Sequence, residues 1–233
     1  CFVNDCVRLR EYAAFNTSGL LVPVNEGKVA NQDLHNSSAV TLLMVTHPHL
    51  LSEAQRLAAL HIQQGMSVKL FTTDQLYNEF SSGVPDPAAI RDLAKMYWDK
   101  YRSSSLPPRY LLLFGDGSFD PLDRIRNNTS LVPAWENDNA LDPLGTYTSD
   151  DFYGYLDDNE DINALGSGNL LDLGIGRIPA KTITEAKQYV DKWVSYHSPS
   201  AFGPWRNDLS FIADDEDNNL HFQDAETMSM TAG

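Results

Sequence analysis

The stretch from Arg109 to Asp120 constrains the fold of this chain most strongly. Tyr110 to Phe114 is an unbroken apolar run that lies between Pro107-Pro108 and Gly115-Asp116-Gly117. A short apolar run bounded in this way predicts a strand buried on both faces. Ligands of open parallel sheets bind just past the carboxyl ends of central strands, where Asp116 would stand. Asp116 is therefore either a functional carboxylate or a turn residue between two glycines.

Strands and helices alternate before this run. Ser52 and Gln55 match a capping box for the first helix, and Asp86-Pro87 matches the start of the second. The order strand, helix, strand, helix, strand predicts a doubly wound α/β fold with a parallel sheet. The predicted strands are Val40 to Thr46 and Ser67 to Thr72, and the predicted helices are about Leu50 to Gly65 and Asp86 to Tyr101.

The pattern resumes after a long aperiodic segment, Ser118 to Gly168, which is rich in Asp, Asn and Gly. Residues 1–39 carry short apolar pieces, Cys6 to Leu9 and Leu20 to Val24, which we interpret as strands or extended connections of a preceding β-rich region. The later elements are predicted as a strand from Leu170 to Gly176, a helix capped by Thr184 and ending at His197, a strand from Leu209 to Ala213, and a helix from near Phe222.

Composition excludes some classes of function. The net charge of −15 argues against nucleic-acid binding, which requires Lys and Arg. No apolar run approaches the ~20 residues that span a bilayer. Cys1 and Cys6 are the only cysteines, and neither has a His nearby in sequence, so we interpret them as structural or incidental. Whether they form a disulfide stays open.

Two acidic clusters are candidate sites. Ser149 to Asp161 offers many carboxylates on irregular backbone, as hard cations prefer, but without the spacing of an EF-hand loop. A solvated acidic loop is the alternative. Asp214 to Asp217 follows a predicted strand, where a carboxylate can orient a catalytic imidazole or bind a cation.

An ordered series of motifs resembles the gingipain family of cysteine peptidases from about Val40 onward. The motifs include Tyr77 to Asp86, Tyr110 to Asp120, Thr148 to Gly154, Gly174 to Pro179 and Phe211 to Asp217. The resemblance implies a caspase-like (gingipain-type) parallel sheet flanked by helices, a His/Cys dyad and calcium sites. It also implies the division 1–39 (the tail of the preceding region), 40–147 (subdomain A) and 148–233 (the start of the catalytic subdomain).

Within that family the chain is most similar to the sortases of the type IX secretion system. This implies a bacterial cell-surface, outer-membrane-associated enzyme. Such an enzyme removes C-terminal sorting domains from secreted proteins and attaches them to anionic lipopolysaccharide. An outer-membrane β-barrel of the secretion apparatus is the implied partner.

The chain departs from the family pattern in its catalytic residues. The Gly-His-Gly and Ala-Cys stretches that carry the dyad do not occur in it. The resemblance therefore implies that His and Cys lie beyond residue 233 and that the chain alone is inactive. Glu216 matches the family carboxylate that orients the His. The position that would bind a substrate Arg falls near His221, so Arg specificity is not carried over.

The resemblance also assigns calcium ligands. Asp116, the loop Asp157 to Glu160, and Asp172 match the family's calcium positions. Asp172 interrupts a predicted apolar strand, and a buried carboxylate requires a cation or hydrogen-bond donors. We therefore predict that these residues bind one Ca²⁺. A catalytically dead, calcium-stabilised binding or scaffold domain is the main alternative function. A metal-dependent phosphotransfer domain built on Asp116 is disfavoured, because no nucleotide-binding Gly loop is apparent.

Overall fold

The computed structural model describes residues 14–25, 27–120, 124–137, 145–163, 169–214 and 216–231. Contacts divide the chain into two units, Cys1–Gln32 and Asp33–Gly233. The described part of the first unit contains the 3₁₀ turn η1 (Thr17–Gly19), which the side chain of Asn16 caps. Leu20 to Val24 forms no strand there and is an extended connection. Cys1, Cys6 and the predicted piece Cys6 to Leu9 lie outside the described residues.

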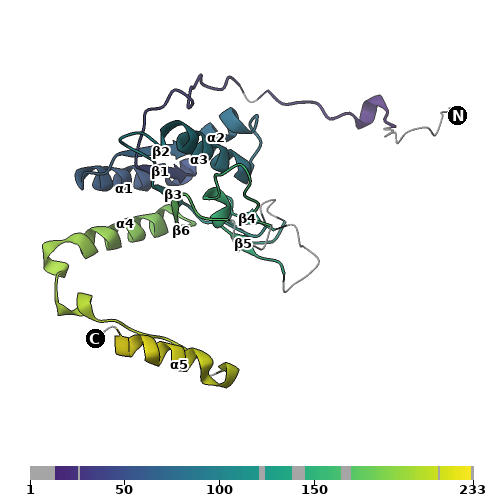
Figure 1. The fold of residues 1–233 in the computed structure, drawn as a ribbon. Helices are drawn as coiled ribbons and strands as arrows, with labels where there is room; N and C mark the ends of the chain where they lie inside the picture. The colour runs from purple at the N-terminus through teal and green to yellow at the C-terminus, as the bar shows by residue number, and fades with distance from the viewer. Residues whose placement is uncertain are drawn as a thin grey trace. The chain divides into compact units, whose positions relative to one another are not determined.

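A four-stranded parallel sheet forms the centre of the second unit (Figure 1). β3 has the bounds that the sequence predicts, and it lies inside the sheet between β1 and β6. The predicted parallel α/β architecture is therefore confirmed. In spatial order the strands are β2 (Val68–Thr72), β1 (Leu42–Thr46), β3 (Tyr110–Phe114) and β6 (Gly174–Ile178).

Helices cover both faces of this sheet, and shorter elements complete the unit (Figure 1). β4 (Trp135–Glu136) pairs antiparallel with β5 (Thr148–Ser149) in a separate two-stranded sheet. The α-helices are α1 (Leu51–Gln63), α2 (Thr73–Phe80), α3 (Pro87–Tyr101), α4 (Ile183–His197) and α5 (Glu216–Thr231), and the 3₁₀ turns are η2 (Pro48–Leu50), η3 (Asp151–Tyr153), η4 (Pro199–Ala201) and η5 (Pro204–Asn207).

Alternate residues of the strands supply two cores. Leu43 and Val45 of β1 point to the face covered by α2 and α3, while Leu42 and Met44 point to the face covered by α1 and α4. All four are buried, which is the two-sided burial that an unbroken apolar strand predicts. Each such side chain contributes about 1.5–3 kcal/mol by leaving water. The strand pattern thus accounts for the layered packing.

The starts of α1 and α2 differ from the predictions. The Ser52/Gln55 capping box is wrong, because η2 runs directly into α1 and places Leu50 at the N-cap without a side-chain bond. α2 was not predicted, although Thr72 and Gln75 form a capping box there: the Thr72 Oγ1 accepts from Gln75 N, and the Gln75 Oε1 accepts from Thr72 N. The start of α3 is confirmed, since the Asp86 side chain accepts from Ala88 N at 2.8 Å.

Three later predictions need correction. β6 begins at Gly174, so the predicted strand Leu170 to Gly176 is displaced toward the C-terminus. Thr182, and not Thr184, caps α4 by accepting from Glu185 N. Leu209 to Ala213 is not a strand in the described chain. The division at residue 147 stays a prediction, although the pairing of β3 with β6 joins both sides of it in one sheet.

Candidate functional site

The loop after β3 is fixed by its backbone. Gly115 has a φ of +153°, and a Cβ at this position would lie 2.8 Å from Val132 Cγ2. Asp116 N donates to Ala180 O at 3.0 Å, and Asp116 O accepts from Leu131 N and Val132 N. The turn that Gly115 permits therefore joins the end of β3 to the backbone of Ala180 and to the backbone of Leu131 and Val132.

The side chain of Asp116 faces a basic residue. Its side chain is 13% exposed, and Lys181 Nζ lies 3.7 Å from its Oδ2. Lys181 is itself 54% exposed, so this ion pair is solvated and contributes little to stability. Asp116 thus stands at the carboxyl edge of the sheet, as predicted, with Lys181 beside it.

Arg177 organises the loops at this edge. Its Nε and Nη2 donate to both carboxylate oxygens of Asp150, each at 2.7 Å. Its Nη1 donates to Gly115 O and Val132 O, at 2.9 and 2.7 Å, and its Nη2 also donates to Pro133 O at 3.2 Å. The planar guanidinium suits this combination of a forked carboxylate contact with carbonyl contacts. One side chain of β6 thereby ties together the loops that follow β3 and β5.

The role of Arg177 was not predicted, because in the sequence it is only one residue of the Gly174 to Pro179 motif. The available signal was an arginine between Gly176 and Ile178, within a strand that packs against β3. A mostly buried arginine requires a carboxylate and further acceptors. That requirement predicts a partner among the acidic residues of the Thr148 to Gly154 motif.

The acidic segment after β5 is held by one face of α3. Arg91 donates to Tyr155 O at 3.0 and 2.5 Å, and Lys95 Nζ lies 2.8 Å from Asp158 Oδ1. Arg102 Nη1 lies 3.7 Å from Asp157 Oδ1. The hydrogen bond from Lys95 lowers the pKa of Asp158. Two carboxylates of the segment therefore have basic partners, although both side chains are largely exposed, Asp158 at 86% and Asp157 at 62%.

Three of the predicted metal ligands come together in and beside this segment. Glu160 Oε2 accepts from Asp157 N at 2.9 Å, and Glu160 Oε1 accepts from Leu170 N at 2.9 Å. Asp172 Oδ2 accepts from Leu156 N at 3.1 Å. Burial raises the pKa of Asp172, and the charges of Asp157 and Glu160 raise it further, against the lowering effect of the Leu156 bond. Asp157, Glu160 and Asp172 are called the acidic triad below.

Asp116 does not belong to this group. It follows the carboxyl end of β3, whereas Asp172 precedes the amino end of β6, which runs parallel to β3 in the register Tyr110↔Gly174. The two carboxylates therefore lie at opposite edges of the sheet, more than a strand length of about 16 Å apart. The prediction that one Ca²⁺ binds all four residues is wrong. Within the described ranges, no three His, Cys, Asp or Glu side chains are arranged to hold a metal ion.

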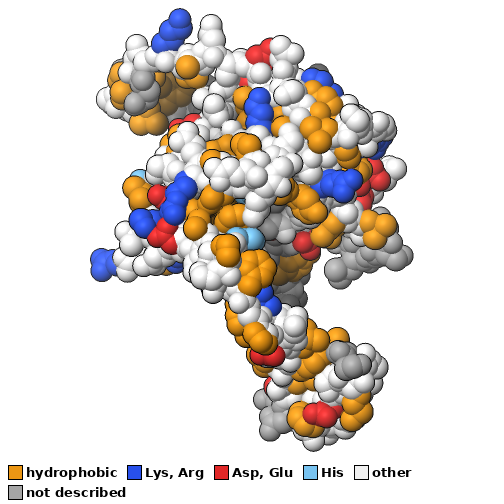
Figure 2. Space-filling view, turned by 90° about the vertical axis from the view of Figure 1, so that its left-hand side faces the viewer, with side chains coloured by type: hydrophobic (Ala, Val, Ile, Leu, Met, Phe, Trp, Pro, Cys, Tyr) orange, Lys and Arg blue, Asp and Glu red, His pale blue; other side chains and the backbone are white. Residues whose placement is uncertain are grey.

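The predicted catalytic carboxylate lies at the start of α5. The side chain of Glu216 is outside the described part of the chain, so its orienting role stays a prediction. Asp217 to Asn219 have left-handed backbone angles, and Asp217 Oδ2 lies 3.4 Å from His221 Nε2. Hydrophobic side chains of the preceding segment and of α5 are exposed, including Ile212 at 95%, and Figure 2 shows such side chains in its lower part.

The parallel sheet and the motifs at its edges define a gingipain-type α/β fold. The profile of Peptidase family C25 matches residues 35–232, and the chain belongs to that family. The crystal structure of dimeric latent PorU from Porphyromonas gingivalis is 30% identical and superposes with a TM-score of 0.67. The match covers 87% of this chain and 20% of that chain. The described chain contains no helix long and apolar enough to cross a membrane.

A second solved structure is more distant. The Arg-specific cysteine proteinase gingipain R (RgpB) is 15% identical, with a TM-score of 0.48, and the match covers 72% of this chain and 31% of that chain. A likeness at that level carries no argument about activity. The comparison with curated proteins gives no match. The chain thus spans one fifth of the length of the PorU chain that it resembles.

Proposed function

We propose that this chain is part of a cell-surface cysteine endopeptidase and sortase. The observation that supports the proposal is the 30% identity to latent PorU across 87% of the chain, together with the family match over residues 35–232. Because the chain spans 20% of that relative, the activity would belong to a longer parent protein. The parent would remove C-terminal sorting domains from type IX secreted proteins.

The proposed chemistry divides between this chain and the rest of the parent. A His/Cys dyad outside the chain would form the thiolate that attacks the scissile carbonyl. Glu216 would hydrogen-bond the imidazole and fix its tautomer, as the carboxylate of a triad does. Transfer of the acyl group to an amine of anionic lipopolysaccharide would complete the sortase reaction at the outer membrane, beside the β-barrel of the secretion apparatus.

A catalytically dead, calcium-stabilised scaffold is the second candidate. The observation in its favour is the acidic triad, whose carboxylate oxygens have the donor chemistry that calcium prefers. Among the described residues these three side chains are not yet arranged to hold an ion, so calcium would have to draw them together. Calcium would offset the repulsion by which Asp157 and Glu160 raise the pKa of Asp172. Arg102 pairs with Asp157, so the ion would compete with that contact.

The chain alone is expected not to react as a peptidase. Its thiols, Cys1 and Cys6, have no His neighbour in sequence to act as a general base. An epoxide or acyl probe of cysteine peptidases should therefore give no labelling that a competing substrate blocks. A Cys1→Ser/Cys6→Ser variant controls for unspecific alkylation. Substrate-blocked labelling of the 233-residue chain would contradict the proposal.

Calcium is expected to stabilise the chain through the acidic triad and not through Asp116. A ligand at 100 times its Kd adds about 2.7 kcal/mol to the free energy of unfolding. The melting temperature should therefore rise between EDTA and millimolar calcium. Asp172→Asn should abolish this rise, whereas Asp116→Asn should keep it, because Asp116 lies at the other edge of the sheet. Identical calcium responses of the two variants would exclude the triad as the site.

The change in melting temperature that Asp172→Asn causes in the absence of calcium provides a further check. The pKa of Asp172 is raised in the folded state, so its protonated form favours folding at low pH. That contribution is lost as pH rises through the folded pKa, and the ionised carboxylate then opposes folding. In EDTA at neutral pH, Asp172→Asn should therefore not lower the melting temperature and should raise it slightly.

A further inference from the structure

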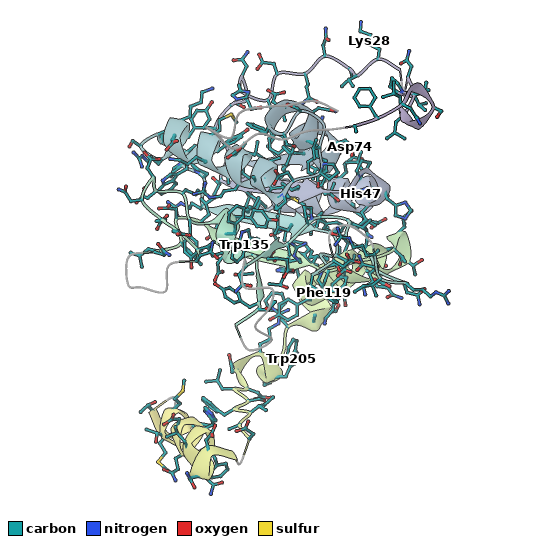
Figure 3. All side chains as sticks on the ribbon, turned by 90° about the vertical axis from the view of Figure 1, so that its right-hand side faces the viewer. Lys28, His47, Asp74, Phe119, Trp135 and Trp205 are labelled. Carbon is teal, nitrogen blue, oxygen red and sulfur yellow. The ribbon has the colours of Figure 1, made fainter. Side chains whose placement is uncertain are left out.

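A polar pocket of about 380 Å³ lies beside the carboxyl ends of β1 and β2, away from the residues that the proposed function uses. Its polar lining comes from the loop after β1, from α2 and from the segment after β3. This is the edge of a parallel sheet where ligands bind. Figure 3 shows His47 and Asp74, which follow β1 and β2. The polar lining residues are His47, Thr73, Asp74, Tyr77, Asn78 and Ser130.

Asp74 gives the pocket its charge. The lining includes no Lys or Arg. His47 Nδ1 accepts from His49 N at 3.1 Å, so the neutral imidazole carries its proton on Nε2. Burial lowers the pKa of His47 despite the opposing charge of Asp74, and burial raises the pKa of Tyr77 to about 12. Both rings are therefore uncharged at neutral pH, and the carboxylate of Asp74 is the formal charge that a ligand meets.

Thr73 supplies a buried hydroxyl without a partner. The residue is 0% exposed, and its Oγ1 makes no hydrogen bond to any described residue. A buried hydroxyl left in this state costs about 1–3 kcal/mol. Native proteins rarely tolerate that cost unless a water or a ligand satisfies the group. The missing hydrogen-bond partner of this hydroxyl therefore suggests that a water or a ligand occupies the pocket.

The rim of the pocket is built rigidly. Gly83 has a φ of +85° and donates from its N to Tyr77 O at 2.7 Å. Ser81 Oγ donates to Val84 O at 2.5 Å, which closes the same turn. Ser82 also adopts a positive φ, of 55°, which costs free energy for a residue with a Cβ. A preorganised rim lowers the entropy that a ligand loses on binding.

The chemistry of the lining selects a class of ligand. An anion is disfavoured, because Asp74 would repel it without a compensating basic side chain in the lining. An ammonium group satisfies the carboxylate by a charge-assisted hydrogen bond and has further protons for hydroxyl and amide acceptors. Pro85, Leu131 and the Tyr77 ring provide apolar surface for a methylene stem.

We propose that this pocket binds an alkylammonium group, with Asp74 as its counter-ion and the Thr73 hydroxyl as an acceptor. The same chemistry is carried by a lysine side chain of a peptide and by a free alkylamine. The site does not involve the His/Cys dyad. A negative result for the pocket would therefore not contradict the proposed peptidase function, and the loss of that function would not contradict the pocket.

Titration of the whole chain by NMR or calorimetry tests the proposal. The probes are an N-acetylated, C-amidated Gly-Lys-Gly peptide, the matched peptide with norleucine, and n-butylamine. The lysine peptide should bind saturably, and the uncharged norleucine peptide should not. Binding of n-butylamine as tight as that of the lysine peptide assigns the site to free amines, whereas weaker binding assigns it to peptides. Equal binding of the lysine and norleucine peptides, or no saturable binding, overturns the proposal and leaves the pocket to water.

Variants separate the pocket from general charge effects. Asp74→Asn should weaken binding of the lysine peptide about tenfold or more, because a charge-assisted bond is lost. Asp208→Asn removes the same charge from an exposed residue outside the pocket and should change nothing. Thr73→Val should weaken binding severalfold without lowering the melting temperature, since it removes an unpartnered hydroxyl. An affinity unchanged by Asp74→Asn contradicts the proposal.

Discussion

Arg177→Met is expected to lower the free energy of unfolding by up to about 3–5 kcal/mol, the range for losing one partner of a buried ion pair, since Arg177 is 14% and Asp150 26% exposed. The substitution keeps an unbranched stem but leaves Asp150 without its forked partner. It also leaves the carbonyls of Gly115, Val132 and Pro133 without the guanidinium donor. Since domains are stable by only about 5–15 kcal/mol, a large part of the stability would be lost. Urea unfolding followed by circular dichroism measures the change.

Arg56→Met is the matched control for this experiment. Arg56 also contacts two carboxylates, Glu53 at 3.1 Å and Asp191 at 2.6 Å, but its side chain is 38% exposed. An exposed pair contributes only about 0–1 kcal/mol, so the control should change stability little. Arg177→Lys should lie between the two, because an ammonium keeps the charge and loses the fork. Equal losses for Arg177→Met and Arg56→Met would show that Arg177 does not hold the loops.

The central elements of the fold could be predicted from local sequence. β3 has a short apolar run bounded by Pro and Gly, and α3 has Asp86 and Pro87 at its start, so each carries its own boundary signals. α2 was not predicted although Thr72 and Gln75 form a capping box, because eight residues give too little apolar periodicity to indicate a helix.

The position of β6 depends on long-range pairing. The apolar pair Leu170-Leu171 suggested an early start, yet both residues are exposed, and the strand begins where Gly174 pairs with Tyr110. Hydrogen bonds to β3 therefore set the register, and local hydrophobicity does not. This displacement also explains why Asp172 was wrongly predicted to interrupt an apolar strand. It lies before the strand and not inside it.

The electrostatic contacts of the candidate sites join residues distant in sequence. Arg91 binds Tyr155 O and Lys95 pairs with Asp158, contacts that span about sixty residues. Sequence alone gives the charges of such groups but not their partners. The separation of Asp116 from Asp172 follows from the direction of parallel strands: the residue after one strand and the residue before its neighbour lie at opposite edges.

In the proposed parent peptidase, Glu216→Gln is expected to lower kcat by about 10⁴-fold while the fold stays intact. The physical reason is that a carboxylate beside the catalytic imidazole fixes its tautomer and stabilises the imidazolium that forms during attack. Glutamine keeps the size of the side chain but loses the charge. Measurement of kcat together with the melting temperature of the same variant separates a catalytic from a structural role.

Asp217→Asn provides the control for Glu216→Gln. Asp217 is the next residue, and its exposed carboxylate lies 3.4 Å from His221, so the substitution removes one negative charge from the same turn. It should leave kcat close to that of the wild type, because a solvated ion pair does not orient the dyad. If Glu216 instead has only a structural role, Glu216→Gln will lower the melting temperature and leave the turnover of the folded enzyme near normal. That second pattern would assign the orienting role to another group of the parent.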